Sequence, residues 1–213
     1  MEKLVMPLWR PEGTTGDEFR DTLLALAAEQ LCQLPAVRAL RLAVVDSDVS
    51  PADNKRMASF GELPDGVLSA WVDSVTHADS LQRLLEPVVA KSAAYLVTES
   101  EQLVNSESVD ARGRLPGFCQ VVFLQRPDRL SEQAWLDIWQ GSHTGIAIGN
   151  VVGSNTANTV CFHFSRYKKS SLMGEKLSTN RAVFVSNFMV CNLPVGTTNI
   201  SPAFRCSSGS PSQ

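Results

Sequence analysis

The sequence predicts an α+β protein made of two successive units, each with the element order β-α-β-β-α-β. Two observations carry this prediction. Residues 1–104 alternate between short apolar stretches and amphipathic segments in that order, and a second stretch repeats the start of the pattern at a constant offset of 116 residues. Because the repeat fades towards the C-terminus, we expect the second unit to be incomplete.

The first unit opens with an apolar stretch at residues 4–9, and a helix follows it. Thr15 and Glu18 stand at the spacing of a capping box, which predicts the start of that helix. Apolar residues then recur at the spacing of one helical face: Phe19, Leu23, Leu26, Ala27 and Leu31. The Leu34-Pro35 pair is expected to end the helix.

Two strands, a second helix and a fourth strand complete the first unit. The strands are expected at 37–45 and 67–75, the helix at 78–91 and the last strand at 93–98. This order is that of the ferredoxin-like unit, whose strands form one antiparallel sheet with both helices on one face. Pro7 fits badly in a first strand that should be central, because proline has no N–H to donate.

The second unit matches the first in strand and helix without a gap. The matching pairs are Val5 and Val121, Leu8 and Leu124, Arg10-Pro11 and Arg126-Pro127, Thr15 and Ser131, Phe19 and Trp135, and Asp21 and Asp137. So many matches in one register indicate a duplication. The same offset predicts further strands at 153–161 and 183–191, but no second helix or fourth strand is visible beyond Pro194.

These patterns divide the chain into four segments. Residues 1–104 are the first unit, 105–116 a charged linker, 117–192 a degenerate second unit and 193–213 a polar tail. The tail ends in small polar residues and lacks apolar periodicity, so it is expected to be irregular.

The second copy also contains a longer sequence motif. It reads Gly-Phe-Cys-Gln-Val-Val-Phe-Leu at 117–124, then Arg126-Pro127, then Trp-Leu-Asp-Ile-Trp-Gln-Gly-Ser-His-Thr at 135–144. This phrase resembles the EthD family of the dimeric α/β-barrel superfamily, whose most recognisable element is Trp-x-x-x-His at the end of the first helix. The first copy resembles a second EthD-type unit in tandem. The resemblance therefore covers about residues 1–148.

The resemblance implies two sheets packed face to face into a barrel, with a ligand cavity between sheet and helices. It also implies small aromatic or polyketide-like substrates and, for members with an assigned activity, dehydration or cofactor-free oxidation. Many members have no known activity. The chain departs from the family at Ala27, which stands where the second copy has His143, and after Ile148, where the pattern is lost.

His143 is the candidate catalytic residue. It shares one predicted helix stripe with Trp135 and Trp139, which places the imidazole on the side facing the core. Such a histidine is either a core residue bonded to a backbone carbonyl or a general acid or base beside an aromatic wall. Trp135 and Trp139 are likewise core residues or substrate contacts, and Arg126 is either solvated or steers an anionic group. Trp71 is interpreted as core.

Composition excludes several other classes. A net charge of −3 gives no field for holding nucleic acid or an acidic membrane, and no run of 18 apolar residues occurs. The five scattered cysteines and the absence of an export signal predict reduced thiols in the cytoplasm. No metal-ligand spacing, dinucleotide loop or phosphate loop is present, so neither a metal nor another cofactor is predicted.

Two hypotheses for function remain, and a third interpretation assigns none. The first is an EthD-like enzyme that uses His143 to move a proton on a small hydrophobic compound, without a cofactor. The second is a non-catalytic module that binds a small ligand or a partner. The third is a truncated or frameshifted product without activity. The tandem units would pair within the chain as a pseudo-dimer or between chains as a homodimer.

Overall fold

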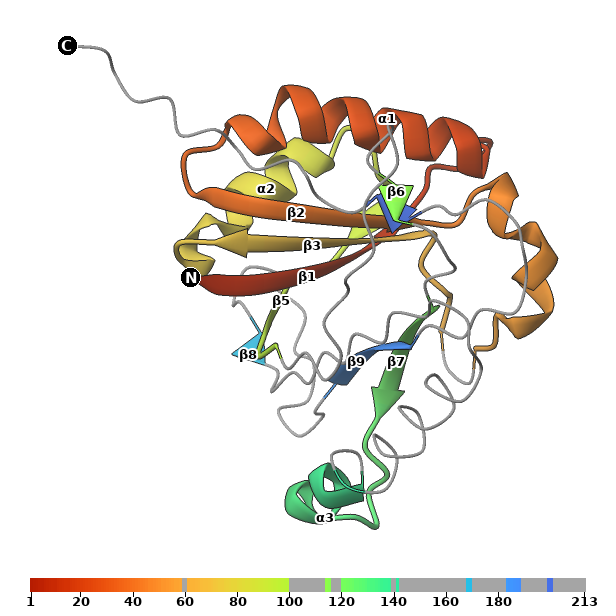
Figure 1. Ribbon diagram of the computed structural model, residues 1–213, viewed down its shortest axis with the longest axis vertical. Helices are drawn as coiled ribbons and strands as arrows, with labels where there is room; N and C mark the ends of the chain where they lie inside the picture. Colours follow the sequence, from red (N-terminus) through yellow and green to blue (C-terminus); the bar gives the residue numbers. More distant parts are fainter. Residues whose placement is uncertain are drawn as a thin grey trace.

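The structure is a computed structural model, and it describes residues 1–58, 61–99, 114–115, 120–138, 141, 168–169, 183–188 and 199–200. Its main part is an antiparallel sheet with helices on one face (Figure 1). The elements of this part are β1 (Glu2–Trp9), α1 (Gly16–Glu29), β2 (Val37–Val44), β3 (Gly66–Val72), α2 (Ala78–Leu85), β4 (Lys91–Ser92) and β5 (Tyr95–Val97). Short 3₁₀ helices occupy Leu31–Gln33, Ser47–Lys55 and Val75–His77.

The strand pairing is that of the predicted first unit. β1 lies between β3 and β5, β2 lies beyond β3, and every one of these pairs is antiparallel. The prediction of an α+β unit with an antiparallel sheet and two helices on one face is therefore confirmed for this part of the chain.

Pro7 is accommodated by a break in the fourth strand. β5 pairs with β1 at Lys3–Val5 and β4 pairs with it at Leu8–Trp9, so the edge is interrupted beside Pro7. The Pro7 carbonyl accepts from the Ala93 N–H at 3.4 Å, on the side of the interruption. Because the N–H and C=O of a strand residue point to the same side, the N–H that Pro7 lacks would also have pointed there. The proline thus removes no bond to β3.

Helix α1 begins as the sequence predicts. The Thr15 hydroxyl accepts from the Glu18 N–H at 3.2 Å, and the Glu18 carboxylate accepts from the Thr15 N–H at 2.8 Å. Beside this cap, Arg20 donates to the buried carboxylate of Asp46 at 2.7 Å and to Asp17 at 2.8 Å. Hydrogen bonds from Ser47, with the charge of Arg20, hold the pKa of Asp17 below its ordinary value. This network ties the start of α1 to the end of β2.

Gly16 is required because the start of α1 lies very close to the backbone that follows β2. A Cβ at this position would lie 2.3 Å from the Val45 carbonyl oxygen, which is backbone and cannot rotate away. We expect Gly16→Ala to lower the free energy of unfolding by about 3 kcal/mol, as overpacking does when the obstacle is rigid. Chemical denaturation followed by circular dichroism measures it. Gly141→Ala is the control, since a Cβ there meets nothing within 4 Å; equal costs for the two variants would contradict the close contact.

Helix α2 is shorter than the sequence predicts. It ends at Leu85 rather than continuing to residue 91. Its last bond runs from the Glu86 N–H to the Gln82 carbonyl at 2.9 Å, and Pro87, the next residue, has no N–H to continue the ladder. The residues that follow form a turn, in which the Val88 and Val89 N–H groups donate to the Leu85 carbonyl.

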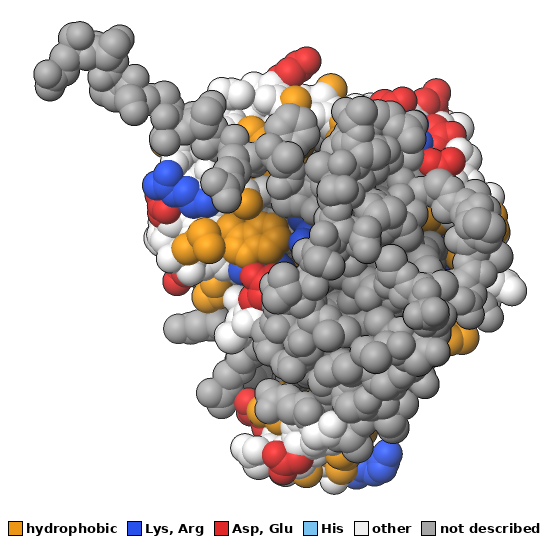
Figure 2. Space-filling view, in the orientation of Figure 1, with side chains coloured by type: hydrophobic (Ala, Val, Ile, Leu, Met, Phe, Trp, Pro, Cys, Tyr) orange, Lys and Arg blue, Asp and Glu red, His pale blue; other side chains and the backbone are white. Residues whose placement is uncertain are grey.

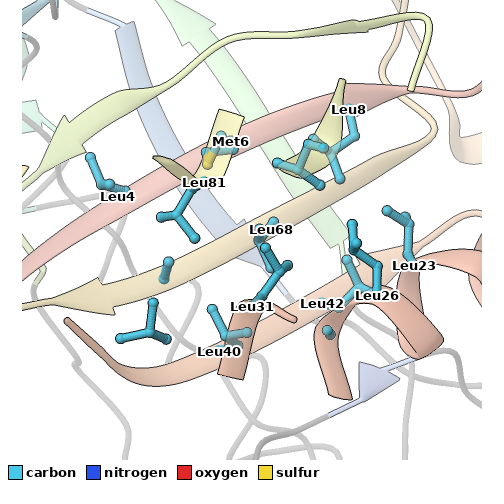
Figure 3. Close-up of a cluster of buried hydrophobic side chains, with 14 of the residues drawn as sticks. Leu4, Met6, Leu8, Leu23, Leu26, Leu31, Leu40, Leu42, Leu68 and Leu81 are labelled. Carbon is cyan, nitrogen blue, oxygen red and sulfur yellow. The ribbon is translucent and has the colours of Figure 1, made fainter. Parts of the chain in front are cut away.

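The main core lies between the sheet and the two helices (Figure 3). Alternate residues of each strand point to this side, and both helices turn their apolar stripes towards them. The five residues predicted as the inner stripe of the first helix are all buried. The side chains in Figure 3 come from all three long strands and from the helices: Leu4, Met6, Leu8, Leu23, Leu26, Leu31, Leu40, Leu42, Leu68 and Leu81.

The opposite face of the sheet is also covered. Val5, Val67 and Val97 form a second buried cluster there, and Val121 and Phe123 pack against it. Both belong to β7 (Gln120–Gln125), which pairs antiparallel with β9 (Val183–Phe188). In Figure 1 this pair lies on the side of the sheet away from α1 and α2.

The remaining described elements are short. They are β6 (Arg114–Leu115), α3 (Glu132–Asp137), β8 (Lys168–Lys169) and β10 (Asn199–Ile200). β8 pairs with β5, and β10 pairs with both β2 and β6. Two residues of the predicted linker and two of the predicted irregular tail are therefore hydrogen-bonded in the main sheet. Other residues of these segments, and the strand predicted at 153–161, lie outside the described residues.

Candidate functional site

The structure describes two of the four residues that the sequence predicts for the site. Trp135 lies in α3 and is half-buried, and Arg126 is half-buried in the loop before that helix. The Arg126 guanidinium donates through Nη1 to the Leu130 carbonyl, so it helps to close its own loop. His143 and Trp139 lie outside the described residues. The predicted grouping of His143 with the tryptophans therefore remains a prediction.

The loop and cap before α3 repeat several backbone and cap hydrogen bonds of those before α1, although Ala134 replaces the Glu18 of the capping box. The Thr14 N–H donates to Pro11 at 3.2 Å, and the Leu130 N–H donates to Pro127 at 3.0 Å. Each helix then begins with a hydroxyl that accepts from the third helical N–H, at 3.1 Å for Ser131. All of these positions are related by the offset of 116 residues. The local structure thus follows this offset from Pro127 to Trp135.

The strand β9 also falls where the repeat predicts a strand. It pairs antiparallel with β7, as β3 does with β1. The register differs by two residues, since Asn187 faces Val121 whereas its equivalent, Trp71, faces Lys3. A shift of two residues keeps every side chain on its own face of the sheet.

A polar ladder crosses the first sheet on the face away from the helices. We use this name for Glu99, Lys3, Trp71 and Arg41, which come in that order from the end of β5, from β1, from β3 and from β2. The Lys3 ammonium donates to Glu99 Oε1 at 2.7 Å and lies 4.3 Å from the centre of the Trp71 ring. The Trp71 indole N–H donates to Glu99 Oε2 at 2.8 Å, and the Arg41 guanidinium lies 5.9 Å from the same ring.

The ladder explains how a lysine can occupy the middle of the sheet. The Lys3 side chain is only 3% exposed, and an isolated ammonium at such a depth would be very costly. The Glu99 carboxylate forms an ion pair with the ammonium, and the face of the Trp71 ring contacts it. The Glu99 side chain is 31% exposed, so the ladder reaches solvent at its carboxylate end. Figure 2 shows apolar side chains flanked by basic and acidic ones on the side of the molecule in view.

The next row of the same face, which begins at Arg41 of the ladder, contains both polar and apolar side chains. The strand register places Arg41, Ser69, Val5 and Tyr95 side by side across four strands. Ser69 and Val5 are buried, and burial raises the pKa of the Tyr95 phenol above its ordinary value. The face thus joins an apolar centre, which contacts β7, to a polar end formed by the ladder.

The sequence analysis did not predict the polar ladder. Trp71 is predicted as core, and it is half-buried with its indole N–H bonded to a carboxylate. Lys3 and Glu99 are not predicted as a pair, because 96 residues separate them. The available signal is the alternation in β1, where Lys3 falls in phase with Val5 and therefore on an inner face.

Removing Glu99 is expected to destabilise the first unit through the lysine that it leaves behind. Glu99→Ala should lower the free energy of unfolding by about 1–3 kcal/mol, which is the cost of leaving a buried group without its partner. The effect stays within this range because the Glu99 carboxylate is partly exposed to solvent. Lys3→Met with Glu99→Ala should recover part of that loss, since no buried charge remains. Denaturant titration of the two variants measures both effects. A double variant less stable than Glu99→Ala would show that the ammonium is not the source of the cost.

Arg10 and Asp65 form a further pair near the end of β1. The Arg10 N–H donates to Asp65 Oδ2 at 3.2 Å, and the guanidinium Nε lies 3.5 Å from Oδ1. Arg10, the repeat equivalent of Arg126, thus has a carboxylate of the chain itself beside its guanidinium.

Two absences among the described residues concern metal ions and membranes. Among them, no group of three or more His, Cys, Asp or Glu side chains is arranged to hold a metal ion. None of the helices in this part of the chain combines the length and apolar character needed to cross a bilayer.

Comparison with known proteins gives a weak structural likeness. No family model and no curated protein matches the chain. A crystal structure provisionally described as a chlorite dismutase is similar with a TM-score of 0.38 and 12% identity, over 88% of this chain and 78% of the other. At these values the likeness assigns neither a family nor an activity.

Proposed function

We propose that the chain is a tandem EthD-type protein that acts on a small hydrophobic compound, aromatic or polyketide-like, by cofactor-independent proton transfer. His143 is the proton-transfer group. Trp135 and Trp139 line the substrate, and Arg126 lies near any anionic group of it. The two units pack sheet against sheet as a barrel, and the reaction is a dehydration or an oxidation by dioxygen.

One observation carries the proposal more than any other. The turn bond and the hydroxyl cap that precede α1 recur before α3 in a single register, and in this register His143 corresponds to Ala27. Ala27 is buried in the core between α1 and the sheet. An imidazole at the equivalent place in the second unit would face the space between helix and sheet, which is where the resemblance puts a ligand.

The chemistry needs only a base of moderate strength. A neutral imidazole can accept a proton from an acidic C–H or O–H group, because its pKa lies near neutrality. With an anthrone as substrate, loss of the C–H proton gives an electron-rich anion that dioxygen can oxidise. The balanced reaction is anthrone plus O₂ giving anthraquinone plus water. The protein would supply position, a dry site and the base.

The proposal is tested by oxygen uptake. The purified chain is mixed with an anthrone in buffer that contains a chelator, and O₂ consumption and quinone absorbance are recorded together. We expect one O₂ consumed for each quinone formed, faster than without protein and unchanged by the chelator. A rate no faster than the uncatalysed one, with every member of a panel of anthrones and hydroxylated aromatics, would remove the enzyme proposal.

A non-catalytic binding or assembly module is the second candidate. It is favoured by the first unit, where the space between helices and sheet is filled by side chains such as Leu23, Leu26 and Leu68. A unit packed in this way has a structural role. Quenching of tryptophan fluorescence by the same compounds, without turnover, would favour this candidate.

A further inference from the structure

We propose that Gln120 and Ser186 are the residues that position the substrate, through hydrogen bonds to an oxygen atom on its ring system. The substrate is then an aromatic ketone or phenol and not a plain hydrocarbon. This inference rests on the tandem-unit part of the proposed function and narrows its substrate class. It concerns binding, so it does not depend on turnover.

The two residues occupy register positions on one face of the second sheet. Val121 and Phe123 of β7 pack against the valine cluster of the first sheet, so the alternation of the strand assigns Gln120 to the opposite face. Ser186 of β9 pairs with Val122, which belongs to the same face as Gln120. Gln120 and Ser186 are therefore diagonal neighbours on that face.

In the first unit the corresponding face carries the main core. By the offset of 116 residues, Gln120 corresponds to Leu4 and Ser186 to Ala70, and both of these residues are 0% exposed. The shift of two residues in the register of β9 makes Leu68 the alternative equivalent of Ser186, and Leu68 is 1% exposed. By either alignment, a polar residue stands where the first unit buries an apolar one.

Two polar residues on such a face need hydrogen-bond partners. A glutamine amide has two N–H donors and an acceptor oxygen, and a serine hydroxyl both donates and accepts. Burying these groups without partners is costly. One serine cannot satisfy all the groups of the glutamine. A ligand that is hydrophobic apart from an oxygen atom would satisfy the amide and also fill the apolar remainder of the face.

The repeat places the proton-transfer group on the same side. Ala27 belongs to the same core cluster as Leu4 and Ala70, and its equivalent is His143. When the imidazole takes the proton from a carbon conjugated with a carbonyl group, the electron pair of the C–H bond moves to the carbonyl oxygen. An N–H of Gln120 would donate to that oxygen. Such a bond is stronger in the transition state than in the ground state, so it lowers the barrier.

The test measures binding of two ligands that differ in one oxygen atom, 9-fluorenone and fluorene, by titration of the tryptophan fluorescence of the full chain. Gln120→Leu, which introduces the residue of the first unit, is expected to lower the affinity for fluorenone by roughly 2- to 10-fold, the usual effect of losing one hydrogen bond. Its affinity for fluorene should be kept or raised. Ser186→Ala should change the ratio of the two affinities in the same direction.

Gln125→Leu is the matched control. It makes the same chemical change on the same strand, but at a position of the face that carries Val121 and Phe123. We expect it to leave both affinities unchanged. Circular dichroism checks that each variant folds, and Ser186→Ala, which removes a single oxygen atom, serves if Gln120→Leu does not fold.

An unchanged ratio of the two affinities in the folded variants would overturn the inference, as would an equal change caused by Gln125→Leu. Failure of the proposed reaction is a separate result, since fluorenone has no proton for the base to remove. Absence of anthrone oxidation, with the expected loss of fluorenone affinity, would remove the reaction and leave the positioning role. Anthrone turnover with an unchanged ratio would do the reverse.

Discussion

Replacing Phe19 with alanine is expected to lower the free energy of unfolding of the first unit by about 3–5 kcal/mol. Among the described residues, Phe19 is the largest fully buried side chain, with 1% of it exposed. It stands in the first turns of α1, and its ring reaches the start of β3, where Cε1 lies 3.5 Å from the position of a Cβ at Gly66. Removing the ring would leave a cavity that helix and sheet cannot close.

The measurement is a denaturant titration followed by far-ultraviolet circular dichroism. Leu24→Ala is the matched control, because Leu24 lies on the same helix but is only half-buried. We expect the control to cost clearly less. A loss below about 1 kcal/mol for Phe19→Ala, the size of an ordinary surface or near-surface effect, would contradict the packing of α1 on β3.

The first unit could be predicted from its sequence because local and non-local signals agree there. The capping box at Thr15, the helical stripe that starts at Phe19 and the alternation in the strands all lead to the same fold. The prediction was wrong about where the second helix ends. Apolar residues continue past Leu85, but Pro87 withholds the N–H that the helix would need.

The polar ladder could not be predicted in the same way. Its contacts join β1, β3 and the end of β5, and they depend on which residues the strand register brings opposite one another. Lys3 faces Trp71 only because β1 and β3 pair in the observed register. Sequence spacing reports faces within one strand, but it does not report partners across strands.

The proposed second unit matches the first at some positions and differs from it at others. Its first strand and the hydroxyl of its helix cap match the first unit, yet the residues that dock α1 in the first unit are not kept. Gly16 corresponds to Glu132, and Arg20 corresponds to Leu136. The helix of the second unit therefore cannot repeat the close approach to a strand end, or the ion pair, that fixes α1.

Replacing His143 with asparagine is expected to lower kcat for anthrone oxidation by about 100-fold or more, the usual scale of general acid–base catalysis. Asparagine can replace one hydrogen bond of the imidazole, so folding should be kept while the titrating group is lost. The wild-type rate should rise with pH through the range in which an imidazole loses its proton, because the neutral form is the base. The variant should lack that rise.

The control for this prediction is Ala27→His, which places an imidazole at the equivalent position of the first unit. Ala27 is 6% exposed within a filled core, so the larger side chain should cost about 1–3 kcal/mol of stability and confer no activity. Steady-state kinetics and melting temperatures are measured for both variants. If His143→Asn leaves turnover unchanged, His143 is not the base. If it lowers the melting temperature and leaves ligand binding intact, the histidine is a core residue and the binding-module interpretation stands.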